Sequence, residues 1–254
     1  MTQTCCPSES WPMALTKDNE HDNLGKIETL DNNLDIYHVG SGKKAIIVIY
    51  DVFGLDNGRN KSICDNLAKE LNCRVIIPDF YRNRDGLHNY GGIPFTADGM
   101  NWVKSFPIDK VLKDCEVVID FLKQMAVDKI FSLGFCWGGW VGFHLSATGL
   151  IDAAASCHAS IKVESLFGNS IEDLSKSVKT PILLCQAGND EENTKKGGDI
   201  EKWVKEEAKM DIDIFEFSEM KHGWVPRGDE SVKEVKRDVA LALDEVKKFF
   251  IKHQ

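Results

Sequence analysis

The feature that most constrains the fold is an alternation of short apolar runs with amphipathic segments between residues 45 and 250. Continuous apolar runs are typical of strands that are buried on both faces of a parallel sheet. Such runs occupy 45–50, 74–78, 129–134, 153–158 and 181–187. The segment 211–217 alternates instead, which indicates an edge or half-exposed strand.

The segments between these runs carry apolar residues at helical spacing. In 60–71, for example, Ile63, Leu67 and Leu71 fall on one helical face. Further helices are expected at 109–125, 138–147, 194–209 and 231–250. The alternation of strands and helices therefore predicts an α/β fold, with a mostly parallel central sheet flanked by helices on both faces.

The remaining segments suggest how the chain is organised. Residues 1–25 are polar, contain two prolines and lack periodicity, so we expect a tail or an edge covering. Two short segments within 27–39 predict an antiparallel hairpin. No repeat or linker interrupts 26–254, so we expect one domain there. The longest irregular stretch, 79–100, follows a strand end, where such sheets build ligand sites, and is a candidate wall of the site.

Charge limits the classes of partner. The chain has 40 acidic and 31 basic residues, which gives a net charge of −9. Phosphate backbones and anionic membranes favour dense Lys and Arg, so neither nucleic acid nor a membrane is expected as a partner. No secretory signal or long apolar span is present, which predicts a cytoplasmic protein, monomeric or homodimeric, with reduced thiols.

The eight cysteines follow no metal-binding spacing. The chain has neither a CxxC pair nor an HExxH motif, so we expect no metal and no organic cofactor. The pair Cys5-Cys6 leaves open a lipidation or metal site. No polybasic or apolar anchor lies beside it, which favours a pair without such a role.

The most informative motif lies in 129–139, which begins as a buried strand and continues through a sharp turn into a helix. The turn reads Gly134-x-Cys136-x-Gly138, the pattern of a nucleophile elbow with cysteine in place of serine. Glycines suit a strained turn at which side chains would collide with the neighbouring strand and helix. The helix N-terminus would favour a thiolate. The alternative is a glycine-rich turn around an inert buried cysteine.

An elbow predicts an acid after a later strand and a histidine after the next one. Asp190 follows the last continuous apolar run, and His222 follows the alternating strand. We therefore expect these two residues to form a catalytic triad with Cys136. Glu191 and Glu192 are rivals for the acid role. Asp190 is preferred because it comes first after the Gly-Asn turn.

The loop after the first buried run supplies the fourth expected element. In nucleophile-elbow enzymes, a backbone N–H from this loop joins the N–H that follows the nucleophile to hold an oxyanion. This predicts backbone donation from Val52 and Trp137. Asp51 begins the same loop, and its alternative role is a helix or turn cap.

At this point the sequence resembles the dienelactone hydrolase (carboxymethylenebutenolidase) family of α/β-hydrolases, in its eukaryotic-type branch. The matching strings, in the order of the family, are YDVFG (50–54), PDFY (78–81), GFCWGG (134–139), AGND (187–190) and KHGW (221–224). The resemblance implies a compact domain with Cys, Asp and His in the site, and an acid before the oxyanion loop that modulates the resting thiol.

The resemblance also implies further site residues. Asp51 stands where bacterial members carry the thiol-modulating Glu. Family members that act on dienelactone bind the substrate carboxylate with two arginines; here Arg82 and Arg84 flank the first position, and Arg227 lies one residue beyond the second. His158 is similar to a strand-end histidine of the eukaryotic branch. It is expected either to line the pocket or to be a core residue whose polar atoms are hydrogen-bonded.

Together these patterns predict a cysteine-dependent hydrolase of small esters or lactones, with Trp224 as a candidate pocket residue. Two alternatives remain open. One is a catalytically silent protein that uses the same fold to bind a small molecule. The other is a different hydrolase, either a thioesterase or a glycan-active enzyme; the latter would need two carboxylates about 5–9 Å apart in a cleft.

Overall fold

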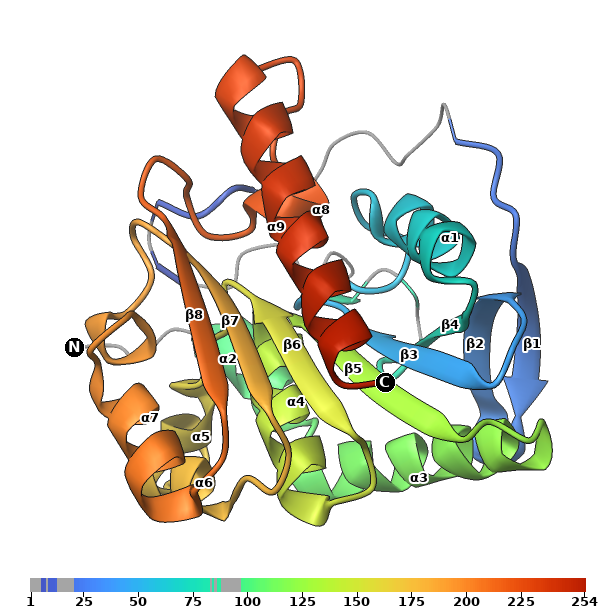
Figure 1. Ribbon diagram of the computed structural model, residues 1–254, viewed down its shortest axis with the longest axis horizontal. Helices are drawn as coiled ribbons and strands as arrows, with labels where there is room; N and C mark the ends of the chain where they lie inside the picture. Colours follow the sequence, from blue (N-terminus) through green and yellow to red (C-terminus); the bar gives the residue numbers. More distant parts are fainter. Residues whose placement is uncertain (1–5, 8, 13–20, 83, 85, 88–96) are drawn as a thin grey trace.

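The centre of the protein is one eight-stranded sheet with the strand order β1-β2-β4-β3-β5-β6-β7-β8 (Figure 1). The computed structural model describes residues 6, 7, 9–12, 21–82, 84, 86, 87 and 97–254. The strands are β1 (Lys26–Leu30), β2 (Leu34–Gly40), β3 (Lys44–Ile49), β4 (Arg74–Pro78), β5 (Lys129–Phe135), β6 (Ala153–Cys157), β7 (Ile182–Ala187) and β8 (Ile212–Phe217).

Every strand predicted from an apolar run is present. β1 and β2 form the expected antiparallel hairpin, β2 is antiparallel to β4, and all other pairs are parallel. β8, the alternating segment, lies at one edge of the sheet. Along the parallel strands Ile49 lies opposite Gly134, and Phe135 opposite Cys157, so the carboxyl ends of β3, β5 and β6 meet at one edge.

Helices cover both faces of this sheet, as the alternation predicts (Figure 1). α1 packs against β2 and β4, and α9 packs against β6 and β7, whereas α3 and α4 lie together on the other face. The helices are α1 (Asn60–Leu71), α2 (Ala97–Lys104), α3 (Ile108–Gln124), α4 (Trp137–Thr148), α5 (Val163–Leu166), α6 (Ile171–Ser177), α7 (Asp199–Lys202), α8 (Trp224–Arg227) and α9 (Lys233–Lys252).

The prediction of a single helix over 194–209 was wrong in detail. A 3-10 turn occupies Glu192–Thr194, α7 begins only at Asp199, and the chain continues as a π-helix over Trp203–Ala208. Gly197 has a φ of +79°, a left-handed conformation that breaks a helix. Apolar periodicity reports only which face is buried, and does not locate such a break.

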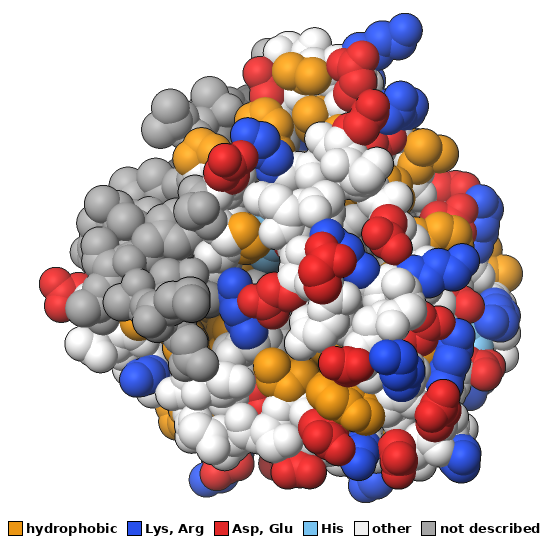
Figure 2. Space-filling model, turned by 90° about the vertical axis from the view of Figure 1, so that its left-hand side faces the viewer, with side chains coloured by type: hydrophobic (Ala, Val, Ile, Leu, Met, Phe, Trp, Pro, Cys, Tyr) orange, Lys and Arg blue, Asp and Glu red, His pale blue; other side chains and the backbone are white. Residues whose placement is uncertain are grey.

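Part of the predicted wall 79–100 is described. The last residues of this stretch begin α2, and residues 83, 85 and 88–96 lie outside the described residues. Among the residues that the structure describes, no helix is long and apolar enough to span a membrane. The face drawn in Figure 2 carries acidic and basic side chains in close alternation.

Candidate active site

The turn between β5 and α4 has the geometry of a nucleophile elbow. Cys136 has φ 53° and ψ −110°, a conformation that costs free energy for any residue with a side chain. A Cβ on Gly138 would collide with the Ile49 carbonyl oxygen, and one on Gly134 would collide with the Gly138 carbonyl oxygen. Only glycine therefore fits on either side of Cys136. The turn presents its sulfur at the edge where the strands end.

The acid and the histidine predicted from sequence lie together. The Nδ1 of His222 is 2.6 Å from Oδ1 of Asp190, and both side chains are buried. The other Asp190 oxygen accepts a hydrogen bond of 2.6 Å from the Ala187 N–H. The backbone N–H of His222 donates to the side-chain oxygen of Asn189 at 2.7 Å. These bonds fix the imidazole plane and the tautomer, with the Nδ1 proton directed at the carboxylate.

The two rival acids are engaged elsewhere. Glu191 pairs with Lys162 at 2.8 Å, and Glu192 pairs with Lys195 at 2.6 Å. Asp190 is thus the acid that the structure brings to His222.

The charge state of the imidazole depends on its neighbours. Burial by itself lowers the pKa of His222, but the negative charges of the Cys136 thiolate and of Asp190 outweigh burial and raise this pKa to about 9. The imidazole therefore keeps its second proton through neutral pH when the sulfur is ionised. A Cys136 thiolate and a His222 imidazolium therefore stabilise each other's charged forms.

His158 and Trp224 both contact this group. The ring of His158 lies edge-on to that of His222, with 4.8 Å between centroids, and 5.3 Å from the ring of Trp224. Burial, and secondarily the charge of His222, hold the pKa of His158 well below its usual value, so this imidazole is neutral. The structure thus places His158, predicted as a pocket or core residue, directly beside the candidate base.

The two candidate oxyanion donors flank the sulfur. Trp137 is the first residue of α4, and Val52 lies in the loop after β3. Within the described part of the chain, neither of these N–H groups donates a hydrogen bond. The start of the predicted wall supports the loop: the Leu87 N–H donates to the Val52 carbonyl at 2.8 Å, and the Asp56 N–H donates to the Arg84 carbonyl at 3.1 Å.

Asp51 forms a buried ion pair with Arg227. The Nε of Arg227 is 2.7 Å from one carboxylate oxygen of Asp51, and the other oxygen accepts a hydrogen bond of 2.9 Å from the Phe53 N–H. Burial raises the pKa of Asp51 although Arg227 opposes the shift, and the negative charge of Cys136 raises it further. Asp51 is therefore electrostatically coupled to the thiol, and it also caps its own loop.

The structure does not show Arg82 and Arg84 directed at the sulfur. Arg82 makes a two-pronged ion pair with Asp114, at 2.8 and 2.9 Å. Arg84 pairs with Asp35 at 2.8 Å. Both arginines have φ near +60°. Their guanidinium groups thus hold the loop after β4 against its neighbours.

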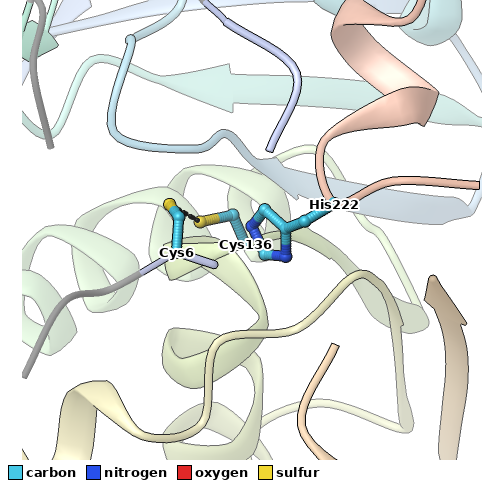
Figure 3. A group of neighbouring side chains, drawn as sticks. All are labelled: Cys6, Cys136 and His222. Carbon is cyan, nitrogen blue, oxygen red and sulfur yellow. Dashed lines mark hydrogen bonds between the residues drawn. The ribbon is translucent and has the colours of Figure 1, made fainter. Parts of the chain in front are cut away.

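The sequence analysis did not identify two neighbours of Cys136. The hydroxyl of Ser160 lies 3.3 Å from the Cys136 sulfur, and its N–H donates to the Cys136 carbonyl at 2.9 Å. The signal for Ser160 was its place just after β6, at the edge where the parallel strands end. The sulfur of Cys6 lies 3.4 Å from that of Cys136 (Figure 3). No sequence signal links these two cysteines, and Cys5 lies outside the described residues.

Three comparisons relate this geometry to known proteins. The model of the Dienelactone hydrolase family matches residues 34–254. The carboxymethylenebutenolidase homolog of Mus musculus is 30% identical over 187 residues, which cover 72% of this chain and 71% of that protein. An endo-1,3;1,4-beta-D-glucanase of Zea mays is 25% identical over 168 residues, 65% of this chain and 49% of that one.

The fold also matches solved structures. A dienelactone hydrolase-like promiscuous phosphotriesterase from metagenomic libraries superposes with a TM-score of 0.63 at 15% identity, over 91% of this chain and 99% of that chain. At this identity the likeness shows the fold alone. It agrees with the α/β architecture that the apolar runs predicted.

Proposed function

Because the chain belongs to the dienelactone hydrolase family, we propose that it is a cysteine-dependent hydrolase of small esters or lactones. The observation that carries this proposal is the alignment of Cys136, at a nucleophile elbow, with a His222 that is hydrogen-bonded to Asp190. The catalytic unit is proposed to be one domain over 26–254. Neither a metal nor an organic cofactor takes part in the steps below.

The first step forms the acyl-enzyme. The Cys136 thiolate attacks the carbonyl carbon, a C–S bond forms, and the carbonyl electron pair moves to oxygen. The N–H groups of Val52 and Trp137 are proposed to hold this oxyanion, and one such donor is typically worth roughly 3 kcal/mol. The oxyanion then collapses, and the imidazolium of His222 gives its Nε2 proton to the leaving alkoxide.

The second step releases the acid. Neutral His222 now takes a proton from water, which attacks the acyl-thiol carbonyl. The tetrahedral intermediate expels the Cys136 thiolate, and the imidazolium is restored. Asp190 stays ionised throughout and stabilises the positive ring. His158 and Trp224 are proposed to line the acyl pocket because their rings contact one another beside His222.

Asp51 is proposed to restrain the resting thiol. A carboxylate near a sulfur disfavours the thiolate, since like charges disfavour each other's ionised forms. Arg227 compensates part of this charge, and it is also the arginine that we propose for a substrate carboxylate, because it lies beside the oxyanion loop. Arg82 and Arg84 remain candidates for that role only if they leave Asp114 and Asp35.

We therefore expect Asp51→Asn to alkylate faster than wild type with iodoacetamide near neutral pH. The variant removes a negative charge near the sulfur and leaves the positive charge of Arg227 less compensated. Both changes favour the thiolate. The measurement is the alkylation rate of Cys136 against pH, followed by mass spectrometry. Superimposable profiles for the two proteins would leave Asp51 only its structural role as a cap for the Val52 loop.

A glycan-active enzyme is the second candidate, favoured by the relative in Zea mays. Such an enzyme would use two carboxylates. Asp51 and Asp190 are the two that could be proposed for this role. Asp190 is bound to His222 and Asp51 to Arg227, so neither is placed to act as a general acid on a sugar. The ester or lactone proposal uses these same contacts as they stand.

The proposal is tested by turnover on a matched panel of lactones, aryl esters, thioesters and β-glucans. We expect hydrolysis of at least one ester or lactone, with a burst of leaving group and an acyl adduct on Cys136. Preference for thioesters would identify a thioesterase, and turnover of glucan alone would identify the glycan-active alternative. If no substrate turns over and an ester-like probe leaves Cys136 unlabelled, the protein is a small-molecule-binding relative.

A further inference from the structure

The described N-terminal residues, 6, 7 and 9–12, form a segment that lies across the candidate active site. The Trp11 N–H donates to the His222 carbonyl at 2.8 Å. Arg227 donates to the Trp11 carbonyl and, at 3.0 Å, to the Pro12 carbonyl. Lys221 pairs with Glu9 at 3.5 Å. These contacts tie the segment to the loop that carries the catalytic histidine.

This segment buries Cys6 against the catalytic atoms. Cys6 is 1% exposed, and its sulfur is 3.4 Å from that of Cys136. One ligand atom each from Cys6, Cys136 and His222 all lie within 4.8 Å of one another. Figure 3 shows the Cys136 sulfur between the Cys6 sulfur and the His222 ring. Three separate parts of the chain thus bring two thiols and one imidazole to a single point.

These distances suit a thiophilic cation. Zinc–sulfur bonds of about 2.3 Å and zinc–nitrogen bonds of about 2.0 Å, in tetrahedral geometry, place ligand atoms roughly 3.5–3.8 Å apart. The two sulfurs are within about 0.4 Å of that spacing, and the imidazole needs a shift of no more than about 1.3 Å. Thiolate and imidazole donors favour zinc over Mg²⁺ or Ca²⁺, which prefer oxygen.

His222 is also prepared as a ligand. Its Nδ1 is held by Asp190, so the remaining nitrogen, Nε2, is the one that would bind a cation. This Nε2 is buried, and among the described residues only Cys136 is placed to share a hydrogen bond with it. A carboxylate that orients an imidazole from its far side is the usual support for a zinc-bound histidine.

We propose that Cys6, Cys136 and His222 form an inhibitory zinc site that closes the active site. Three protein ligands leave the fourth tetrahedral position for water or another small ligand. The bound ion would engage the sulfur and the imidazole nitrogen that hydrolysis requires, and would hold Cys6 over the nucleophile. The site itself rests on the distances above, whereas its inhibitory effect rests on the proposed hydrolase function.

The binding experiment uses Co²⁺ as a spectroscopic stand-in for Zn²⁺. Full-length protein, reduced with a phosphine and freed of metal, is titrated with Co²⁺, and Zn²⁺ is then used to displace it. We expect the wild-type protein to bind one equivalent of Co²⁺, with a thiolate-to-metal charge-transfer absorption that corresponds to two sulfurs. In Cys6→Ala and in Cys136→Ala this absorption should fall to about half. Cys73→Ala is the matched control. Cys73 is also buried, but it directly precedes the amino end of β4, whereas the candidate site lies at the carboxyl ends of the parallel strands.

The affinity of Cys6→Ala for Zn²⁺ should fall by more than the roughly 10- to 100-fold cost of losing a residue that only orients a metal ligand. Its ester turnover, relative to its own rate with chelator, should resist Zn²⁺ by a similar factor. Unchanged Zn²⁺ affinity in Cys6→Ala, or no charge-transfer band in wild type, would overturn the site. A wild-type protein that is inactive on every substrate even when freed of metal, and that still shows the two-sulfur band with Co²⁺, would instead refute the hydrolase proposal and leave the site standing.

Discussion

Cys136→Ala should lose at least about four orders of magnitude in kcat on any ester or lactone that the wild-type protein hydrolyses, because loss of a triad nucleophile costs on the order of 10⁶ in the best-studied case. No acyl-thiol can form without the sulfur. The left-handed backbone of residue 136 strains Cys and Ala alike, and the side chain is only one atom smaller. The folded structure should therefore survive.

The measurement is steady-state turnover, together with the thermal midpoint of each variant. Cys185→Ala is a suitable control, because Cys185 is equally buried but lies within β7. We expect this control to keep most of the activity at a modest loss of stability. A Cys136→Ala protein that retained even a tenth of wild-type turnover would refute the assignment of the nucleophile.

Asp190→Asn should lower kcat by roughly two to four orders of magnitude, since an amide can hold the imidazole in the wrong tautomer and cannot stabilise its positive charge. The pH profile should change as well. Asp190 contributes to raising the pKa of His222 to about 9, so His222 keeps the proton it donates up to about that pH. Removal of the carboxylate lowers this pKa, and the alkaline fall in kcat/KM should move to lower pH.

Glu191→Gln is the matched control for this prediction. Glu191 is adjacent in sequence and carries the same charge, but it pairs with Lys162, and a partly exposed pair of this kind is worth about 0–1 kcal/mol. We expect nearly wild-type kinetics and an unmoved alkaline limb. The acid would have to be reassigned to Glu191 if its variant lost far more activity than Asp190→Asn.

Local chemistry was enough to predict much of the fold. Continuous apolar runs are typical of strands buried on both faces, and the alternating segment 211–217 is typical of an edge strand, so all the strands from 45 onward could be predicted from the sequence. The nucleophile elbow could also be predicted from the sequence. Gly134 is dictated by a collision with the Gly138 carbonyl oxygen, which is part of the same motif, whereas Gly138 is dictated by the Ile49 carbonyl oxygen at the end of β3.

Prediction was weaker where conformation depends on surroundings. The segment 194–209 has helical periodicity, yet it divides into a 3-10 turn, α7 and a π-helix. The resemblance predicted that arginines bind a substrate carboxylate, but an arginine can also form an ion pair with a carboxylate of the protein that lies close to it. For Arg82 and Arg84 these are Asp114 and Asp35, on segments far away in sequence.

By itself the sequence determined the α/β architecture, the nucleophile turn and the order of Cys136, Asp190 and His222, because each depends on residues that are close along the chain or on a strand order that the hydrophobic pattern dictates. Only the tertiary structure decided which acid reaches His222, that Arg227 pairs with Asp51, and that Cys6 lies against Cys136. The physical reason is that these are contacts between side chains that are brought together by packing. Cys6 and Cys136 are 130 residues apart, and no local pattern encodes a distance across the folded protein.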